Sequence, residues 1–323
     1  MAFFDLSLAE LQEYTPDLAV PGDLDAFWAA TLAETREFDL DATFVPVDNG
    51  FTLVDSYDVT FSGFGGNRIK GWLHVPAGST GPLSTVVEYL GYSGGRGLVH
   101  TRVLYALAGH AHFVMDSRGQ GWGWATADTP DAAADSGLQA APGMMTRGIL
   151  DPETYYFRRI FADAVRAVEA AKASPFVDPD RIVVAGISQG GGITLAVSAL
   201  VDGLAGALVD VPFLCNFERA ITLTDNDPYQ EIVRYLRRNR PDAERAYRTL
   251  SYFDGAVLAS RATAPALFST ALMDQTCPPS TVFAAFNRYG GEKSISVYPF
   301  NEHEGGQEHH EVVRLDWLRS LFG

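Results

Sequence analysis

Six short, largely apolar runs that alternate with helical patterns place the strongest constraint on how this 323-residue chain can fold. The runs cover residues 85–90, 112–116, 181–187, 207–211, 265–272 and 294–299. Continuous apolar runs of this length are typical of parallel strands that are buried on both faces. The clearest helical pattern between them has one apolar face, formed by Phe157, Ile160, Phe161, Ala164, Val165 and Val168. The alternation predicts an α/β fold in which helices cover both faces of a mostly parallel central sheet.

The chain before these runs has a different pattern. Residues 53–61 and 68–75 are predicted to form two strands, and the connection 62–67 is rich in residues that tolerate positive φ. These segments therefore predict an antiparallel N-terminal hairpin. An antiparallel start that leads into a parallel, doubly wound sheet is typical of the α/β-hydrolase fold.

The predicted organisation is a single domain over residues 1–323 with two additions. Residues 1–40 are expected to form a mostly helical extension. Asp23 or Asp25 is a candidate cap for a helix that runs to about Phe38, with an apolar face formed by Phe27, Trp28, Leu32 and Ala33. The polar, Arg-rich segment 225–254 interrupts the alternation. We expect it to lie over the carboxyl ends of the strands as a cap or an oligomer contact.

The charge and the cysteines argue against several classes of partner. The chain has 24 Lys and Arg against 40 Asp and Glu, a net charge of -16, so neither nucleic acid nor an anionic membrane surface is an expected partner. Cys215 and Cys277 lack the spacing of zinc ligands, and we expect two buried free thiols and no metal. The N-terminus has no basic region followed by a long apolar run, which predicts a cytoplasmic protein.

A G-x-S-x-G sequence, residues 186–190, is the strongest indication of chemistry. It follows the apolar strand 181–185 and opens the small-residue helix 190–200, which is the setting of a nucleophile elbow. Gly186 and Gly190 lack Cβ atoms, so that strand and helix can approach closely around a strained turn. Ser188 is thereby predicted to be a nucleophile near the positive end of a helix.

A serine nucleophile needs a general base and an acid further along the chain, in the order Ser, acid, His. His303 follows strand 294–299 directly, whereas His309 and His310 begin the final helix and are alternatives. The histidines before the nucleophile are interpreted as surface or core residues: His74, His100, His110 and His112. For the acid, Asp274 follows strand 265–272, and Asp210, one strand earlier, is the alternative. We predict the triad Ser188, Asp274 and His303.

The oxyanion hole is expected to contain two main-chain donors. The N–H of Gln189 follows the nucleophile, and the Gly-rich loop 91–95 after strand 85–90 offers the N–H of Tyr92.

The chain resembles the acetyl xylan esterases and cephalosporin C deacetylases of carbohydrate esterase family 7. The similarity is carried by Arg118-Gly119-Gln120, the 186–190 elbow, the 273–281 segment and His303-Glu304, which occur in the family's order across nearly the whole chain. One departure is Leu90, where the family's pattern has a histidine before Gly-Tyr.

The resemblance implies a serine esterase that removes acetyl groups from small acetylated sugars and antibiotics such as cephalosporin C. It also implies no cofactor, a cytoplasmic enzyme and a homo-hexamer built as a trimer of dimers. Its triad is Ser188, Asp274 and His303, and its oxyanion donors are Gln189 and Tyr92.

Other residues near the elbow receive supporting roles. Arg118 and Gln120 are expected to hold loops by hydrogen bonds. Aromatic residues are candidates for lining a substrate pocket: Tyr92, Trp122, Trp124 and Phe213. Two alternatives stay open: a peptidase or dienelactone-type hydrolase of the same fold, the second of which normally has Cys in place of Ser188, and a catalytically silent binding protein.

Overall fold

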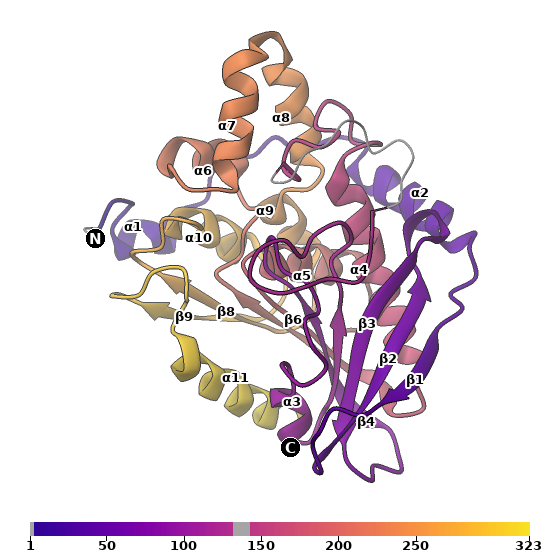
Figure 1. Ribbon diagram of the computed structural model, residues 1–323. Helices are drawn as coiled ribbons and strands as arrows, with labels where there is room; N and C mark the ends of the chain where they lie inside the picture. Colours follow the sequence, from indigo (N-terminus) through magenta and orange to yellow (C-terminus); the bar gives the residue numbers. More distant parts are fainter. Residues whose placement is uncertain (1–2, 132–142) are drawn as a thin grey trace.

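A nine-stranded sheet dominates the computed structural model, which describes residues 3–131 and 143–323 (Figure 1). The strand order is β1-β2-β3-β5-β4-β6-β7-β8-β9, antiparallel from β1 through the β3–β5 pair and parallel from β5 onward. This is the predicted arrangement, a mostly parallel sheet with an antiparallel start. The strands are β1 Thr43–Val47, β2 Val54–Ser62, β3 Arg68–Pro76, β4 Leu83–Tyr89, β5 Ala111–Met115, β6 Val177–Ile187, β7 Gly206–Asp210, β8 Ala266–Ala271 and β9 Lys293–Tyr298.

The predicted hairpin is β2 with β3, whose register runs from Val54 opposite Pro76 to Ser62 opposite Arg68. Strand β1 was not predicted. It pairs with β2 at the edge of the sheet, contains Pro46 and is largely exposed, so it lacks an apolar pattern. Proline is tolerated at such an edge because one side of the strand forms no ladder hydrogen bonds.

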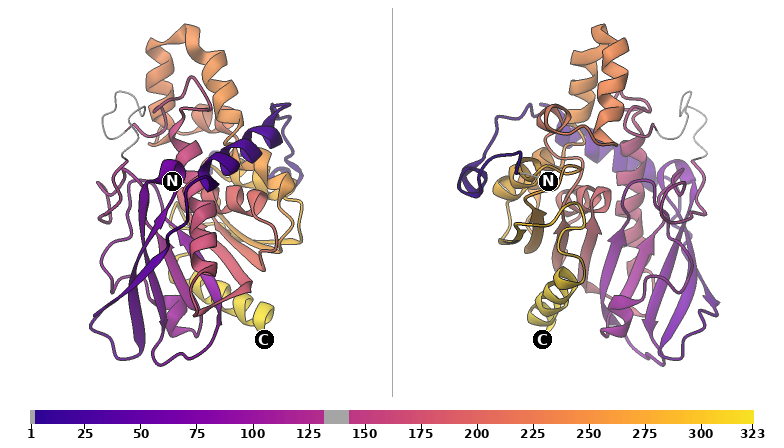
Figure 2. Two further views of the ribbon diagram at one scale, coloured as in Figure 1. Left: turned by 90° about the vertical axis from the view of Figure 1, so that its right-hand side faces the viewer. Right: turned by 60° about the vertical axis from the view of Figure 1, so that its left-hand side comes forward.

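The helices are α1 Leu8–Glu13, α2 Leu24–Arg36, α3 Leu104–Leu107, α4 Tyr156–Lys172, α5 Gln189–Leu200, α6 Phe217–Leu223, α7 Tyr229–Arg238, α8 Ala243–Ser251, α9 Gly255–Leu258, α10 Pro279–Arg288 and α11 Gln307–Phe322. Single turns of 3-10 helix occupy Phe64–Gly66, Arg240–Asp242 and Ala259–Arg261. Figure 2 shows α11 on one face of the sheet and α4 on the other.

Successive strand residues point to opposite faces and build two apolar layers. On one face, residues such as Val184, Val209 and Phe268 pack in the larger core with side chains of α2, α4 and α5. On the other face, a smaller cluster joins the strands to α3 and α11; its members are Val86, Tyr105, Val183, Ala185, Leu208, Leu267 and Leu318. Burial on both faces explains why these strands read as continuous apolar runs.

The N-terminal extension contains two helices, and its first two residues lie outside the described part. Helix α1 was not predicted, although Ser7 and Glu10 form a capping box at its start. Helix α2 is the predicted one, but it ends at Arg36 rather than near Phe38, the Asp23 side chain forms no capping hydrogen bond, and Ala33 is exposed. The buried residues of α2 instead follow a helical spacing that excludes Ala33: Leu24, Phe27, Trp28, Thr31, Leu32 and Thr35.

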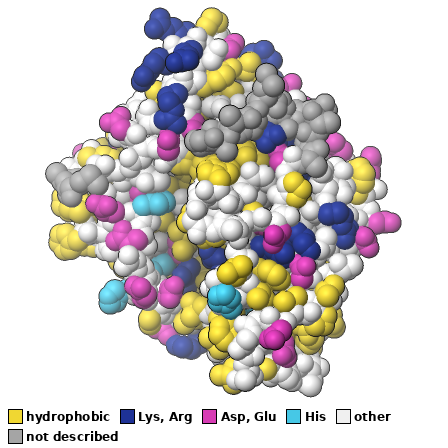
Figure 3. Space-filling view, viewed as in Figure 1, with side chains coloured by type: hydrophobic (Ala, Val, Ile, Leu, Met, Phe, Trp, Pro, Cys, Tyr) yellow, Lys and Arg dark blue, Asp and Glu magenta, His cyan; other side chains and the backbone are white. Residues whose placement is uncertain are grey.

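Segment 225–254 contains α7 and α8, which form a helical hairpin at the top of Figure 1. Lys and Arg side chains gather there in Figure 3, on a molecule of net negative charge. The exposed arginines of the hairpin are Arg234, Arg237, Arg238, Arg240, Arg245 and Arg248. No helix in the described part of the chain has the length and apolar character needed to cross a membrane.

Candidate active site

Ser188 occupies a sharp turn between β6 and α5, with φ 60° and ψ -120°. A Cβ atom on Gly186 would lie 2.2 Å from the carbonyl carbon of Gly190, and one on Gly190 would lie 2.1 Å from the carbonyl oxygen of Tyr89. Only glycine fits at either position, because both contacts are with backbone. The N–H of Ser188 donates to the carbonyl oxygen of Asp210 at 3.0 Å, which fastens the turn to β7.

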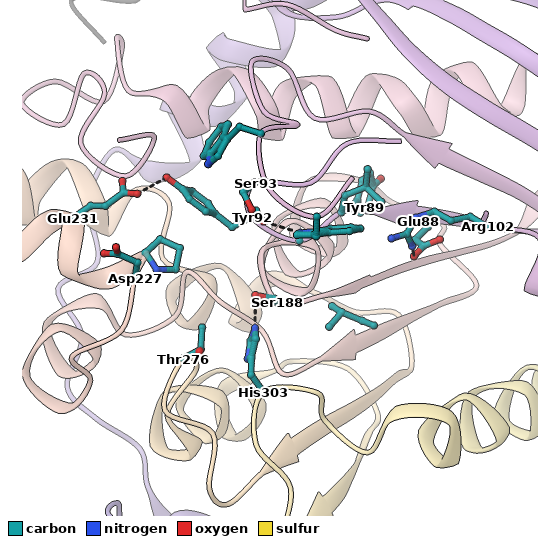
Figure 4. A pocket seen from close by; sticks show the side chains of 16 residues that line it. Glu88, Tyr89, Tyr92, Ser93, Arg102, Ser188, Asp227, Glu231, Thr276 and His303 are labelled. Carbon is teal, nitrogen blue, oxygen red and sulfur yellow. Dashed lines mark hydrogen bonds and ion pairs between the residues drawn. The ribbon is translucent and has the colours of Figure 1, made fainter. Parts of the chain in front are cut away.

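Three side chains from three loops form one hydrogen-bonded chain. The Nε2 atom of His303 lies 2.9 Å from the Oγ atom of Ser188, as the dashed line in Figure 4 marks. The Nδ1 atom of His303 lies 2.8 Å from Oδ2 of Asp274. Because a carboxylate only accepts, Nδ1 donates to Asp274 and leaves Nε2 free to accept the serine proton.

Asp274 is fully buried, and its second oxygen accepts the N–H groups of Thr276 at 2.8 Å and Cys277 at 2.9 Å. These bonds hold the carboxylate beside His303. The His303 side chain is one-third exposed, so it faces both the buried acid and the solvent-accessible pocket.

The alternative residues are engaged elsewhere. Asp210 is bound by His310 and Arg314 rather than by His303, so it does not serve as the partner of His303. His309 and His100 are exposed. Three earlier histidines are buried and hydrogen-bonded: His74 to Ser56, His110 to Ser84 and His112 to Glu88.

The predicted oxyanion donors lie beside the elbow. Gln189 is the first residue of α5, where N–H groups lack intrahelical partners. Its buried side chain donates to the carbonyl oxygen of Leu90 at 3.1 Å and so holds the loop of Tyr92 against the helix. Leu90, which differs from the family's histidine, is buried in a small cluster with Trp72 and Val114 and also borders the cavity above Ser188.

Gln120 braces this loop, whereas Arg118 bonds to α4 and to the carbonyl oxygen of Phe64 in the connection between β2 and β3. Gln120 accepts the N–H of Ser93 at 2.7 Å and donates to the side chain of Gln189 at 2.8 Å. Arg118 is fully buried and donates to Asp163 through two nitrogens, at 2.5 and 2.7 Å. That these two residues hold loops near the elbow stays a prediction.

A cavity of about 510 Å³ opens above Ser188 and His303. In Figure 4, Glu231 and Asp227 lie on one side of Ser188, and Glu88 and Arg102 lie on the other. The lining residues are Glu88, Tyr89, Leu90, Gly91, Tyr92, Ser93, Arg102, Trp122, Trp124, Ile187, Ser188, Asp227, Pro228, Glu231, Thr276 and His303.

The predicted aromatic residues occupy different positions around this cavity. Trp124 lies so close to the oxyanion loop that a Cβ on Gly94 would come within 2.1 Å of its ring, and its Nε1 donates to the carbonyl oxygen of Tyr92 at 2.9 Å. Trp122 contacts Tyr92 edge to face. Phe213 does not line the cavity: it is fully buried, with its ring centroid 6.3 Å from that of Tyr92.

The charged residues that line the cavity were not predicted from the sequence. Glu231, in the first turns of α7, accepts the Tyr92 hydroxyl at 2.8 Å and the N–H of Met145 at 3.1 Å. Burial raises the pKa of the Glu231 carboxyl. Burial, together with the neighbouring Glu231, raises the pKa of the Tyr92 hydroxyl. Glu88 and Arg102 were missed as well. No local pattern marks these residues, because they come from segments far apart in the sequence.

Asp274, Cys277 and His303 are the group within the described ranges whose side chains could together hold a metal ion, with ligand atoms within 4.8 Å of one another. Burial, with Asp274 nearby, raises the pKa of the Cys277 thiol well above its ordinary value, and Asp274 and His303 are already bonded to each other. The donor set therefore suits a catalytic triad better than zinc, which binds thiolate. Both cysteines are free and buried, as predicted.

Comparison with known proteins agrees with this geometry. The acetyl xylan esterase (AXE1) family matches residues 1–321. The acetyl esterase Axe7A of Xylanibacter ruminicola is 25% identical over 317 residues, which cover 96% of this chain and 68% of that protein.

Two solved structures are similar along almost the whole chain. An acetyl xylan esterase from Paenibacillus sp. R4 has 39% identity and a TM-score of 0.92, covering 98% of this chain and 99% of that one. Acetyl xylan esterase 1 from Thermoanaerobacterium sp. JW/SL YS485 has 32% identity and a TM-score of 0.90, covering 99% and 100%. This chain thus belongs to the acetyl xylan esterase family, as its motifs indicated, and is a carboxylic ester hydrolase of the α/β-hydrolase fold.

Proposed function

We propose that this enzyme removes acetyl groups from small acetylated sugars, xylo-oligosaccharides above all, and from cephalosporin C. The observation that carries the proposal is the hydrogen-bonded chain Asp274, His303, Ser188 at the base of the cavity, in a protein of the acetyl xylan esterase family. The tryptophans at the cavity support a sugar as the alcohol part, since an aromatic ring offers an apolar face against which a sugar ring can pack.

The proposed reaction begins with proton transfer from the Ser188 hydroxyl to Nε2 of His303 as Oγ attacks the acetyl carbonyl carbon. The carbonyl oxygen becomes an oxyanion, which the N–H groups of Gln189 and Tyr92 stabilise. Asp274 holds the imidazole in the correct tautomer and stabilises its positive charge.

Collapse of this intermediate breaks the bond between the carbonyl carbon and the sugar oxygen, and His303 gives its proton to the leaving alcohol. The acetyl group is then bound to Ser188 as an acyl-enzyme. A water molecule gives one proton to His303 and attacks the carbonyl, the proton then passes to Ser188 as the acyl bond breaks, and the product leaves as acetic acid, which ionises to acetate in solution.

Acetate release tests this proposal. We expect the wild type to release acetate from p-nitrophenyl acetate, an acetylated xylo-oligosaccharide and cephalosporin C, and Ser188→Ala to abolish all three activities. Retained activity in the variant would refute Ser188 as nucleophile. If a fluorophosphonate failed to label Ser188 and no ester were cleaved, a silent binding protein would be the better interpretation.

The organisation of the protein is part of the proposal. We infer that residues 1–323 form one domain and that segment 225–254 acts as a cap, which is supported by the position of Asp227, Pro228 and Glu231 on the cavity wall. The family resemblance supports a cytoplasmic homo-hexamer. Light scattering should then give six times the 35.0 kDa mass of the chain, and a monomer mass would contradict the hexamer.

A further inference from the structure

A second Asp–His pair, Asp210 and His310, lies behind the elbow and takes no direct part in the proposed reaction. His310 is 2% exposed and Asp210 is 3% exposed. The Nε2 atom of His310 lies 2.8 Å from Oδ1 of Asp210 and, because a carboxylate only accepts, donates to it. Arg314, one turn further along α11, donates to the other oxygen at 3.0 Å, and Ser269 donates to Oδ1 at 3.2 Å.

Asp210 connects this pair to the nucleophile. It is the last residue of β7, where it lies opposite Ile187 of β6 and Ser269 of β8. Its carbonyl oxygen accepts the N–H of Ser188 at 3.0 Å. The same residue therefore holds the elbow with its main chain and the start of α11 with its side chain.

His310 connects the pair to the catalytic histidine. His303 lies on the loop 299–306 between β9 and α11. Tyr298, the last residue of β9, has its hydroxyl 2.8 Å from Nδ1 of His310, and the two rings meet edge to face. The loop that carries His303 is thus closed at its base by a hydrogen bond between the residue before it and a residue of the first turn after it.

A main-chain bond also ties the loop to the segment that carries Asp274, because the carbonyl oxygen of Asn301 accepts the N–H of Met273 at 3.2 Å. Phe300 is 78% exposed, and Glu302 and Glu304 are exposed. Gly305 and Gly306 are buried with positive φ, against Val211 and the Tyr298 ring respectively. A surface loop of this kind keeps a side chain within hydrogen-bond reach only if its ends are fixed.

We propose that His310 and Asp210 are positioning residues, which hold the His303 loop at the distance from Ser188 that proton transfer requires. The proposal rests on the proposed serine esterase function. It predicts that loss of the pair slows the chemical step more than it weakens substrate binding, because neither residue lines the cavity.

The test compares His310→Phe, His310→Gln and Tyr298→Phe with the wild type. His309→Gln is the matched control, since His309 is the exposed neighbour on the same turn. For each variant, the concentration of active sites is titrated with a fluorophosphonate, and kcat per titrated site and KM are measured on p-nitrophenyl acetate well below the melting temperature.

We expect His310→Phe to lower kcat per titrated site, and the rate constant of fluorophosphonate labelling, by about 10- to 100-fold, with KM changed less than about threefold. His310→Gln keeps a donor for Asp210 and should lie between Phe and the wild type. Tyr298→Phe removes only the hydroxyl and should lower kcat by a smaller factor, and the control should be unchanged.

A purely structural role would lower the melting temperature or the fraction of active sites but leave kcat per titrated site within twofold of the wild type. That result in both His310→Phe and Tyr298→Phe would overturn the proposal. The labelling rate needs no natural substrate. If the fluorophosphonate labelled the wild type rapidly but the enzyme left acetylated sugars intact, the proposed substrate would be refuted. The comparison of the His310 variants would still decide the positioning role.

Discussion

Ser188 shows how much of the site depends on the conformation of single residues. Its φ of 60° lies in a region that residues with side chains seldom adopt. The strain is maintained because β6 and α5 are both fixed and because Gly186 and Gly190 allow the chain to turn between them. Removing either glycine should therefore disturb the elbow directly.

Gly190→Ala tests the close approach at the elbow. The new Cβ would lie 2.1 Å from the carbonyl oxygen of Tyr89, which cannot move without shifting β4. We expect a loss of about 3 kcal/mol in the free energy of unfolding, measured in denaturant, together with loss of esterase activity. Gly22→Ala is the control, because a Cβ there meets nothing within 4 Å. Equal stability of the two variants would contradict this account of the elbow.

Asp274→Asn tests the orientation of His303. An amide placed in the same backbone N–H bonds would present its NH₂ group to His303 and favour the wrong tautomer. We expect kcat for p-nitrophenyl acetate to fall about 10³- to 10⁴-fold while the melting temperature changes little. Exposed Asp225→Asn should keep full activity. A decrease in kcat of less than tenfold would argue against Asp274 as the acid.

At the scale of elements, α7 completes a wall that the sheet alone does not provide. Glu231 accepts the Tyr92 hydroxyl, and the same hydroxyl accepts the N–H of Met144 at 3.1 Å. Tyr92 also belongs to the loop expected to supply an oxyanion donor. The helical hairpin and the oxyanion loop are therefore connected through one buried carboxylate.

The variant Glu231→Ala tests whether α7 shapes substrate binding. It leaves the Tyr92 hydroxyl and the N–H of Met145 without their shared acceptor, so we expect the free energy of unfolding to fall by about 2 kcal/mol. KM for an acetylated xylo-oligosaccharide should rise more than KM for p-nitrophenyl acetate, which occupies less of the cavity. Glu244→Ala, at an exposed site of the same hairpin, is the control. Equal changes in the two KM values would mean that α7 does not shape the part of the cavity that holds the sugar.

At the scale of the whole molecule, buried ionisable groups make stability depend on pH. Burial, with His112 nearby, lowers the pKa of His74 from its ordinary value of 6.5 to about 3. Burial alone would raise the pKa of Glu88, but Arg102 and His112 hold it at about 2. Both groups bind fewer protons in the folded state than in the unfolded chain, so acid favours unfolding.

The His74 contribution has its own pH window. Below pH 6.5 the unfolded chain protonates His74 and the folded protein does not, so stability should fall as pH decreases from 6.5, by at most about 1.4 kcal/mol per pH unit from this residue. We expect His74→Asn to flatten the curve of unfolding free energy between pH 6.5 and 5, as measured by urea denaturation. His100→Asn, at an exposed site, should leave the slope unchanged. Parallel curves for wild type and His74→Asn would contradict the assignment.

The sequence by itself determined the central strands, the hairpin, the elbow and the three triad candidates. Each depends on a local pattern: an apolar run, a Gly-rich turn, or a polar residue just after a strand. Parallel strands bring their carboxyl ends to one edge, so residues that follow β6, β8 and β9 can meet there.

The tertiary structure decided between the aspartates and between the histidines that the sequence had left as alternatives. Asp210 and Asp274 both end or follow a strand, and His303 and His310 are seven residues apart, yet Asp274 binds His303 and Asp210 binds His310. The tertiary structure also decided that Phe213 lies behind the cavity and that Glu231 lies on its wall. Such contacts join segments distant in sequence, so they depend on how the elements pack and leave no periodic signal in the chain.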